Sequence, residues 1–226
     1  MNDTFDAVIF DLDGTLIDSM WAWDKIDEIY LGQFGVKADE FSEEEVEGMS
    51  FTETAQYMKT RFNIEDDVEK IKKDINQIAL EFYKSQVPLK EGVREFLDYL
   101  DGQGIKMGIA TSNSYELINV ILEVHHIKNK FGAICTSCEV EKGKPYPYVY
   151  EKVAKDLGVE PKRCLTFEDV PNGVLAAKRA GMTSCAIRDR QDEEMEERLR
   201  QEAHYFVEDY REIIAYYENK NQETYA

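Results

Sequence analysis

Apolar residues along this chain follow two different periods. From residue 91 onward, short apolar runs typical of buried strands are separated by helical segments of about 10–15 residues. Together with an apolar run near the N-terminus, the predicted strands are residues 8–10, 107–110, 133–135, 164–167, 183–187 and 205–207. The predicted helices are residues 93–100, 117–124, 148–157, 174–180, 195–202 and 210–217. Strands joined by helices of this length form right-handed βαβ units, so the sequence predicts an α/β fold with a parallel sheet.

Residues 19–87 follow only the helical period and contain no convincing strand. The residues at helical spacing are Trp21, Ile26, Ile29 and Tyr30, then Thr54, Tyr57, Met58 and Arg61, then Ile71, Ile75, Ile78 and Phe82. Pro88 marks the exit, because proline stops a helix and favours an extended link. The sequence therefore predicts an all-helical domain of about four helices at 19–87, inserted into a core formed by residues 1–18 and 88–226.

The charge of the chain limits its partners. The 226 residues contain 27 Lys and Arg against 46 Asp and Glu, which gives a net charge of −19. Such a surface repels nucleic acid and anionic membranes, so a phosphate site here must be a local basic spot. The acidic N-terminus lacks a signal-peptide pattern, and no apolar stretch reaches about 18 residues. We expect a cytoplasmic monomer or weak homodimer with no nucleic-acid or membrane partner.

Two acidic residues directly follow the first predicted strand. Asp11 and Asp13 are two positions apart, so in extended chain both carboxylates face one side while Leu12 turns into the core. Gly14 then permits a tight turn. Paired carboxylates at a strand end repel each other, and a hard cation would relieve this repulsion. A calcium loop is the alternative, but its twelfth position is Ala22, which has no ligand atom.

Polar residues also follow the second and third strands, where ligands bind in a parallel sheet. Thr111, Ser112 and Asn113 offer hydroxyls and backbone N–H groups that can hold a phosphate oxygen, although such residues usually cap a helix. Lys144 stands before a proline in extended chain and can contact a phosphoryl group as a point charge. Taken alone, it is more simply a solvated lysine, and Lys142 is a nearby competitor.

The fourth strand is followed by Glu168 and Asp169. Two adjacent acids at the end of a buried strand are costly without a cation. Mg²⁺ favours one or two carboxylates with water and a phosphate, which Asp11 and Asp169 can supply. The alternative is that Asp169 caps the following helix.

The order of these four motifs resembles that of the haloacid dehalogenase superfamily, and the match covers nearly all of the core. Gly143-Lys144-Pro145 and Phe167-Glu168-Asp169 further resemble its β-phosphoglucomutase-like branch. The resemblance implies a Rossmann-like core with the first strand central, and a small helical cap inserted after the first motif.

The resemblance also implies a mechanism for a Mg²⁺-dependent phosphatase of a small phosphorylated metabolite. Asp11 is the nucleophile that forms an aspartyl-phosphate, and Asp13 is the general acid and base. The phosphoryl group is bound by Lys144 and by residues 111–113. The implied Mg²⁺ ligands are Asp11, the Asp13 backbone carbonyl and Asp169, with Glu168 behind them or reaching through water.

The cap departs from the pattern that holds a second phosphate in the mutase of this branch. Glu47 and Phe51 stand where that pattern has basic residues, so we favour a phosphatase over a sugar-phosphate mutase. A non-catalytic binding protein is a third hypothesis, and phosphonate hydrolysis needs a cap lysine, for which Lys25 is the candidate. The cap residues that could face the substrate are Trp21, Trp23, Phe51 and Tyr57, although aromatic residues at this spacing are more often core.

Overall fold

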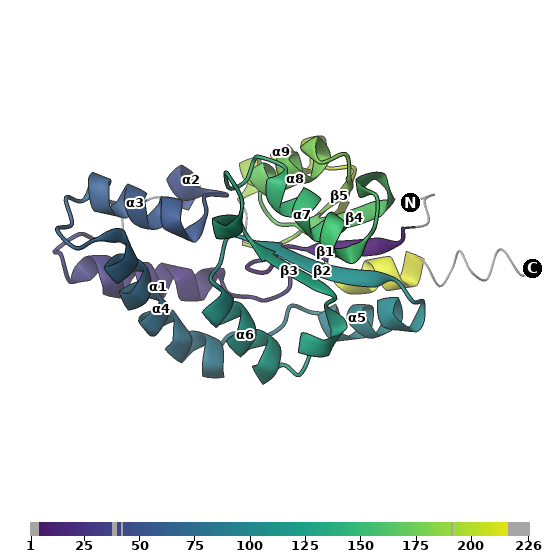
Figure 1. Cartoon of the computed structure of the whole chain (residues 1–226), viewed down its shortest axis with the longest axis horizontal. Helices are drawn as coiled ribbons and strands as arrows, with labels where there is room; N and C mark the ends of the chain where they lie inside the picture. The colour runs from purple at the N-terminus through teal and green to yellow at the C-terminus, as the bar shows by residue number, and fades with distance from the viewer. Residues whose placement is uncertain (1–4, 38–39, 42, 191, 217–226) are drawn as a thin grey trace, which may run out of the picture.

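A parallel sheet of six strands forms the centre of the described chain. The computed structural model describes residues 5–37, 40–41, 43–190 and 192–216. The strands are β1 (Ala7–Phe10), β2 (Lys106–Thr111), β3 (Ala133–Thr136), β4 (Cys164–Glu168), β5 (Thr183–Ile187) and β6 (Tyr205–Val207). Their order is β3-β2-β1-β4-β5-β6, with every pair parallel. The predicted α/β fold is confirmed, and β1 lies inside the sheet between β2 and β4 (Figure 1).

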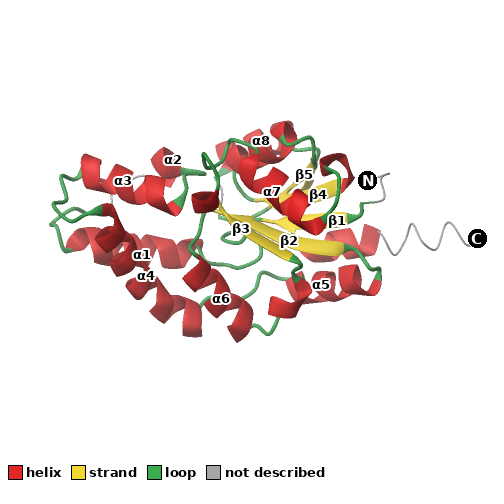
Figure 2. Cartoon of the chain, in the orientation of Figure 1, coloured by secondary structure: helices red, strands yellow, loops and turns green. Residues whose placement is uncertain are grey.

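Helices cover both faces of this sheet because successive strand residues point to opposite sides. Val8 and Phe10 of β1 join the core with α5 (Val93–Gly102), α6 (Tyr115–Val124) and the helical residues 210–216. Ala7 and Ile9 pack instead against α7 (Tyr148–Leu157) and α8 (Pro171–Arg179). Figure 2 shows α7 and α8 on one side of the strands and α5 and α6 on the other. Helix α9 (Glu193–Glu202) packs beside α8 and β6.

The predicted helices at 93–100, 117–124, 148–157 and 195–202 agree with α5, α6, α7 and α9 to within two residues at each end. Helix α8 begins at Pro171, three residues before the predicted start at 174, because proline suits the first helical position, where its missing N–H costs nothing. Residue 217, the predicted end of the last helix, lies outside the described residues. No helix in the described part of the chain is both long and apolar enough for a membrane crossing.

We call residues 19–87 the cap, and its described residues form helices and loops with no strand. The cap contains α1 (Met20–Gly32), α2 (Glu43–Val46), α3 (Phe51–Arg61) and α4 (Val68–Ser85). It lies beyond the carboxyl ends of the strands (Figure 1). Ile29 shares the helical spacing of Ile26 and Tyr30, which are buried in α1, but its own side chain is 46% exposed. In α4 the buried row is Ile71, Ile75, Ala79 and Tyr83, which repeats every fourth residue.

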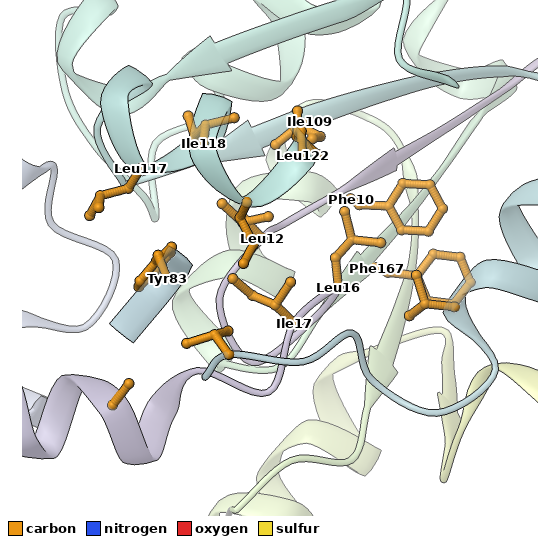
Figure 3. Close-up of a cluster of buried hydrophobic side chains, with 14 of the residues drawn as sticks. Phe10, Leu12, Leu16, Ile17, Tyr83, Ile109, Leu117, Ile118, Leu122 and Phe167 are labelled. Atoms are coloured by element: carbon orange, nitrogen blue, oxygen red, sulfur yellow. The ribbon is translucent and has the colours of Figure 1, made fainter. Parts of the chain in front are cut away.

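The turn after β1 is fixed by its apolar residues. Leu12, Leu16 and Ile17 are buried in the same cluster as Phe10 and Phe167, whose rings stack 5.4 Å apart (Figure 3). Burial of each such side chain stabilises the fold by about 1.5–3 kcal/mol. Because Leu12 points into the core, the carboxylates of Asp11 and Asp13 are directed away from it.

Candidate active site

The loop after β1 is held by backbone contacts on two sides. The Asp11 N–H donates to the Phe167 carbonyl at 3.0 Å, and the Lys90 ammonium donates to the Gly14 carbonyl at 2.7 Å. Gly14 has φ of +72°, and a Cβ there would lie 2.1 Å from a carboxylate oxygen of Asp169. Only glycine therefore allows this turn and the close approach of Asp169. The Thr15 hydroxyl donates to the same carboxylate at 3.0 Å.

Three carboxylates meet one lysine at the carboxyl edge of the sheet. Asp11, Glu168 and Asp169 are buried and offer oxygens that all lie within 4.8 Å of one another. The Lys144 ammonium lies 2.6 Å from Asp11 Oδ1 and 2.6 Å from Glu168 Oε1. Lys144 is only 5% exposed, so it is not the solvated lysine that its segment suggests when taken alone. One positive charge thus faces three buried acidic groups.

This excess of acid changes the protonation of the cluster. Burial raises the pKa of Asp11 to about 8. Lys144 lowers this pKa, but its effect is smaller than the combined effect of burial and of the nearby carboxylates of Glu168 and Asp13, which raise it. Burial, together with Asp11, also raises the pKa of Asp169 well above its ordinary value. Burial alone would lower the pKa of Lys144, but Asp11 and Glu168 outweigh it, so the lysine pKa is raised. A divalent cation would stabilise the charged carboxylates.

The donor set fits such a cation. Buried carboxylate oxygens are the ligands that Mg²⁺ prefers. Glu168 Oε2 is buried and has no hydrogen-bond partner among the described residues, while the other oxygen of Glu168 contacts Lys144 and accepts from the Tyr150 hydroxyl. The carboxylate also packs against Gly173, where an added Cβ would lie 2.0 Å from Glu168 Cδ. The sequence analysis did not identify Tyr150 or the close approach of Gly173.

Four side chains donate hydrogen bonds to the carboxylate of Asp13. Ser19 donates at 2.7 Å, Trp23 at 3.1 Å and Asn113 at 2.8 Å, and the fourth donor is the Tyr83 hydroxyl. Three of the four, all but Asn113, belong to the cap, so the position of the cap determines the orientation of Asp13. Sequence analysis placed Asn113 with the phosphate-binding residues and did not identify Tyr83. The only signal for Tyr83 is its place in the buried row of α4.

The candidate residues 111–113 and Asp169 do not occupy the N-cap positions of the helices that follow them. Helix α6 is capped by the Ser114 side chain, and Val170 occupies the N-cap position of α8. Thr111 is buried, and its hydroxyl accepts a hydrogen bond from the Asn113 N–H at 3.1 Å. The capping alternatives for residues 111–113 and for Asp169 therefore do not explain these residues.

The cap contacts the core directly over the acidic cluster. The Asn172 N–H donates to the Glu47 carboxylate at 2.8 Å, and the Phe51 N–H donates to the Ser112 carbonyl at 3.1 Å. The Ser112 hydroxyl is 3.4 Å from the carbonyl of Gly48. These contacts enclose a cavity of about 440 Å³ between cap and core.

The floor of the cavity is formed by the candidate site residues Asp11, Asp13, Thr111, Ser112, Asn113, Lys144, Glu168 and Asp169. Of the four aromatic cap residues that were candidates to face the substrate, Trp23 and Phe51 line the cavity. Trp21 instead packs on another aromatic ring of the cap at 6.0 Å, and Tyr57 donates to a surface glutamate. Lys25 is exposed and pairs with a neighbouring glutamate at 2.7 Å, so it does not supply the cap lysine that phosphonate hydrolysis needs.

A parallel sheet of this order, with a helical insert after its first strand and carboxylates at its carboxyl edge, defines a Rossmann-like α/β enzyme. The chain belongs to the haloacid dehalogenase-like hydrolases, whose family model matches residues 8–187. The resemblance of the four motifs to this superfamily is thereby confirmed.

Individual relatives cover most of the chain. Hexitol phosphatase B of Escherichia coli is 29% identical over 184 residues, which are 80% of this chain and 82% of that protein. A phosphorylated carbohydrates phosphatase of Thermotoga maritima is 28% identical over 177 residues, 78% of this chain and 82% of that protein. In fold, the chain is similar to β-phosphoglucomutase from Clostridium difficile, with a TM-score of 0.79, 22% identity, and coverage of 98% and 99% of the two chains.

Proposed function

We propose that this protein is a Mg²⁺-dependent phosphatase that hydrolyses a small phosphorylated metabolite through an aspartyl-phosphate on Asp11. The observation that carries the proposal is the contact of one buried lysine, Lys144, with a buried carboxylate cluster at the sheet edge. Relatives named as phosphatases of hexitol and carbohydrate phosphates support a phosphate monoester as substrate.

Asp11 attacks the phosphorus atom, and the bond from phosphorus to the leaving oxygen breaks. Asp13 gives a proton to that oxygen and then takes one from the water that hydrolyses the aspartyl-phosphate. Lys144 and Thr111 hold the phosphoryl oxygens. The Lys144 ammonium lies 2.6 Å from Asp11, so it contacts both the nucleophile and the bound substrate. The four donors to Asp13 hold its carboxylate above the nucleophile in one orientation.

Asp11, Asp169 and the Asp13 backbone carbonyl would hold Mg²⁺, with Glu168 behind them. The ion supplies positive charge that offsets the repulsion between the anionic nucleophile and the anionic phosphate. Glu168 also keeps Lys144 in place, because the two are paired at 2.6 Å and Glu168 is fully buried.

The first test is p-nitrophenyl phosphate turnover with Mg²⁺ by the Asp11→Asn variant. We expect loss of turnover with retained folding, because the amide cannot act as the nucleophile. Asp98→Asn is the matched control, since Asp98 is an exposed carboxylate that pairs with a surface lysine. Turnover by Asp11→Asn at the unaltered rate would refute the assignment of the nucleophile.

Two other hypotheses give different results. Phosphorus NMR with glucose 1-phosphate and a bisphosphate primer would show isomerisation without phosphate release if the protein were a mutase. A non-catalytic binding protein would release no phosphate from any ester. Its melting temperature would also not rise with Mg²⁺ and beryllofluoride, which mimics a phosphoryl group on an aspartate.

A further inference from the structure

The part of the cavity beyond the phosphoryl-binding residues is mostly apolar. Its cap wall is formed by the side chains of Trp23, Phe41, Met49, Phe51 and Met58. Two of these five residues, Phe51 and Met58, are almost fully buried. A substrate group that enters this space loses contact with water, and the wall offers it mainly hydrocarbon and aromatic surface. Buried hydroxyl groups without partners are costly in such a place.

Two hydrogen-bonding groups of the cap that line the cavity are already engaged. The Trp23 N–H donates to Asp13, and the Glu47 carboxylate accepts from the Asn172 N–H. The Thr54 hydroxyl is a further polar group of the cap that lines the cavity. Against the five side chains of this wall, a polyol chain would bury hydroxyls that receive no hydrogen bond.

The charges that line the cavity disfavour a second anion. Asp27, Glu47 and Asp192 are all among the lining residues. Among the described lining residues the basic ones are Lys144, which contacts Asp11 and Glu168, and Arg190, which pairs with Asp24 at 2.8 Å. A second phosphate or carboxylate of the substrate would face these acids without a cation set aside for it.

We infer that the substrate is a phosphate monoester whose leaving group carries an apolar ring, is neutral or positively charged, and has no second anionic group. The inference rests on the proposed function. The ring lies against Phe51 and Met49, and the phosphoryl group lies on Lys144.

Matched esters of primary alcohols test this inference without changing the chemistry of the bond that breaks. The probes are 2-phenylethyl phosphate, sorbitol 6-phosphate, and 2-(4-carboxyphenyl)ethyl phosphate, which adds one negative charge to the ring. We expect kcat/KM for 2-phenylethyl phosphate to exceed that for each of the other two by at least about tenfold, the discrimination that an apolar pocket gives.

Two variants test where the ring is recognised. Phe51→Leu should lower kcat/KM for 2-phenylethyl phosphate more than for sorbitol 6-phosphate. Met49→Lys places a cation on the same wall and should raise kcat/KM for the carboxylated ester. Met49 lies in the turn between α2 and α3 and is partly exposed, so this variant is expected to fold; a thermal melt checks both variants.

The results distinguish a wrong substrate class from a wrong proposed function. Equal or faster hydrolysis of sorbitol 6-phosphate would overturn the ring-bearing substrate and leave the phosphatase intact. So would ratios of kcat/KM among the three esters that stay the same as in the unaltered protein in both folded variants. No phosphate release from any ester, p-nitrophenyl phosphate included, would overturn the phosphatase and the inference with it.

Discussion

Replacement of Gly173 by alanine tests whether the buried Glu168 carboxylate holds the site together. An added Cβ would lie 2.0 Å from Glu168 Cδ and 2.1 and 2.3 Å from its two oxygens. Non-bonded Cβ contacts under 3.0 Å essentially do not occur, so the carboxylate must move by about 1 Å or more. That movement stretches its contact with Lys144, now 2.6 Å, and its hydrogen bond from Tyr150.

The expected cost follows from these contacts. Overpacking a tight interior costs about 1–3 kcal/mol, and breaking a buried ion pair costs about 3–5 kcal/mol. We therefore expect the free energy of unfolding of Gly173→Ala to fall by about 3 kcal/mol, between these limits. Because Lys144 loses its anchor, kcat/KM should fall by about 100-fold, the usual effect of a 1 Å misplacement.

Gly102→Ala is the matched control. Gly102 ends α5, and a Cβ there meets nothing within 4 Å. Alanine in a helix is favoured over glycine by about 0.5–1 kcal/mol, so this variant should be as stable as the unaltered protein or slightly more so. Urea denaturation followed by circular dichroism, and p-nitrophenyl phosphate turnover, measure both variants. If Gly173→Ala matched Gly102→Ala in both measurements, Glu168 would have no part in holding the site.

Three further changes probe the charges and donors of the site. In urea denaturation without metal, Lys144→Met should lower the free energy of unfolding by about 3–5 kcal/mol, because it leaves buried carboxylates without their cation. Lys130→Met is the control: it removes surface ion pairs with Asp98 and Asp101 and should lower the free energy of unfolding by about 1 kcal/mol or less. Tyr83→Phe removes a donor to Asp13 and should lower kcat more than it raises KM in steady-state assays. Tyr30→Phe is its control and should leave kcat and KM unchanged, because the Tyr30 hydroxyl has no partner among the described residues. Mg²⁺ should raise the melting temperature in thermal scans, and Asp169→Asn should abolish most of this gain; equal gains in both proteins would contradict the role of Asp169.

The sheet and its edge could be predicted because both depend on local sequence. The apolar run before Asp11 and the alternation of helical and strand periods specify parallel βαβ units. In such a sheet the carboxyl ends of the strands share one edge, so Asp11, Lys144 and Asp169 are brought close despite their separation in sequence. The tight turn at Gly14 was likewise visible in the sequence.

Contacts between cap and core could not be predicted, since they depend on how two packed units meet. Tyr83 looks like any other buried position of α4, and only the folded chain brings its hydroxyl to Asp13. Glu47 looks like a solvated acid, yet its carboxylate accepts a hydrogen bond from Asn172. For the same reason the sequence did not separate Trp23, which lines the cavity, from Trp21, which does not.

In the proposed mechanism, Asp11 carries the phosphoryl group during turnover. Acid quenching of the enzyme during hydrolysis of a ³²P-labelled ester with Mg²⁺, followed by peptide mapping, tests this assignment. We expect a label that survives acid and is lost in base, on the peptide that contains Asp11. A label on any other residue would show that Asp11 is not the nucleophile.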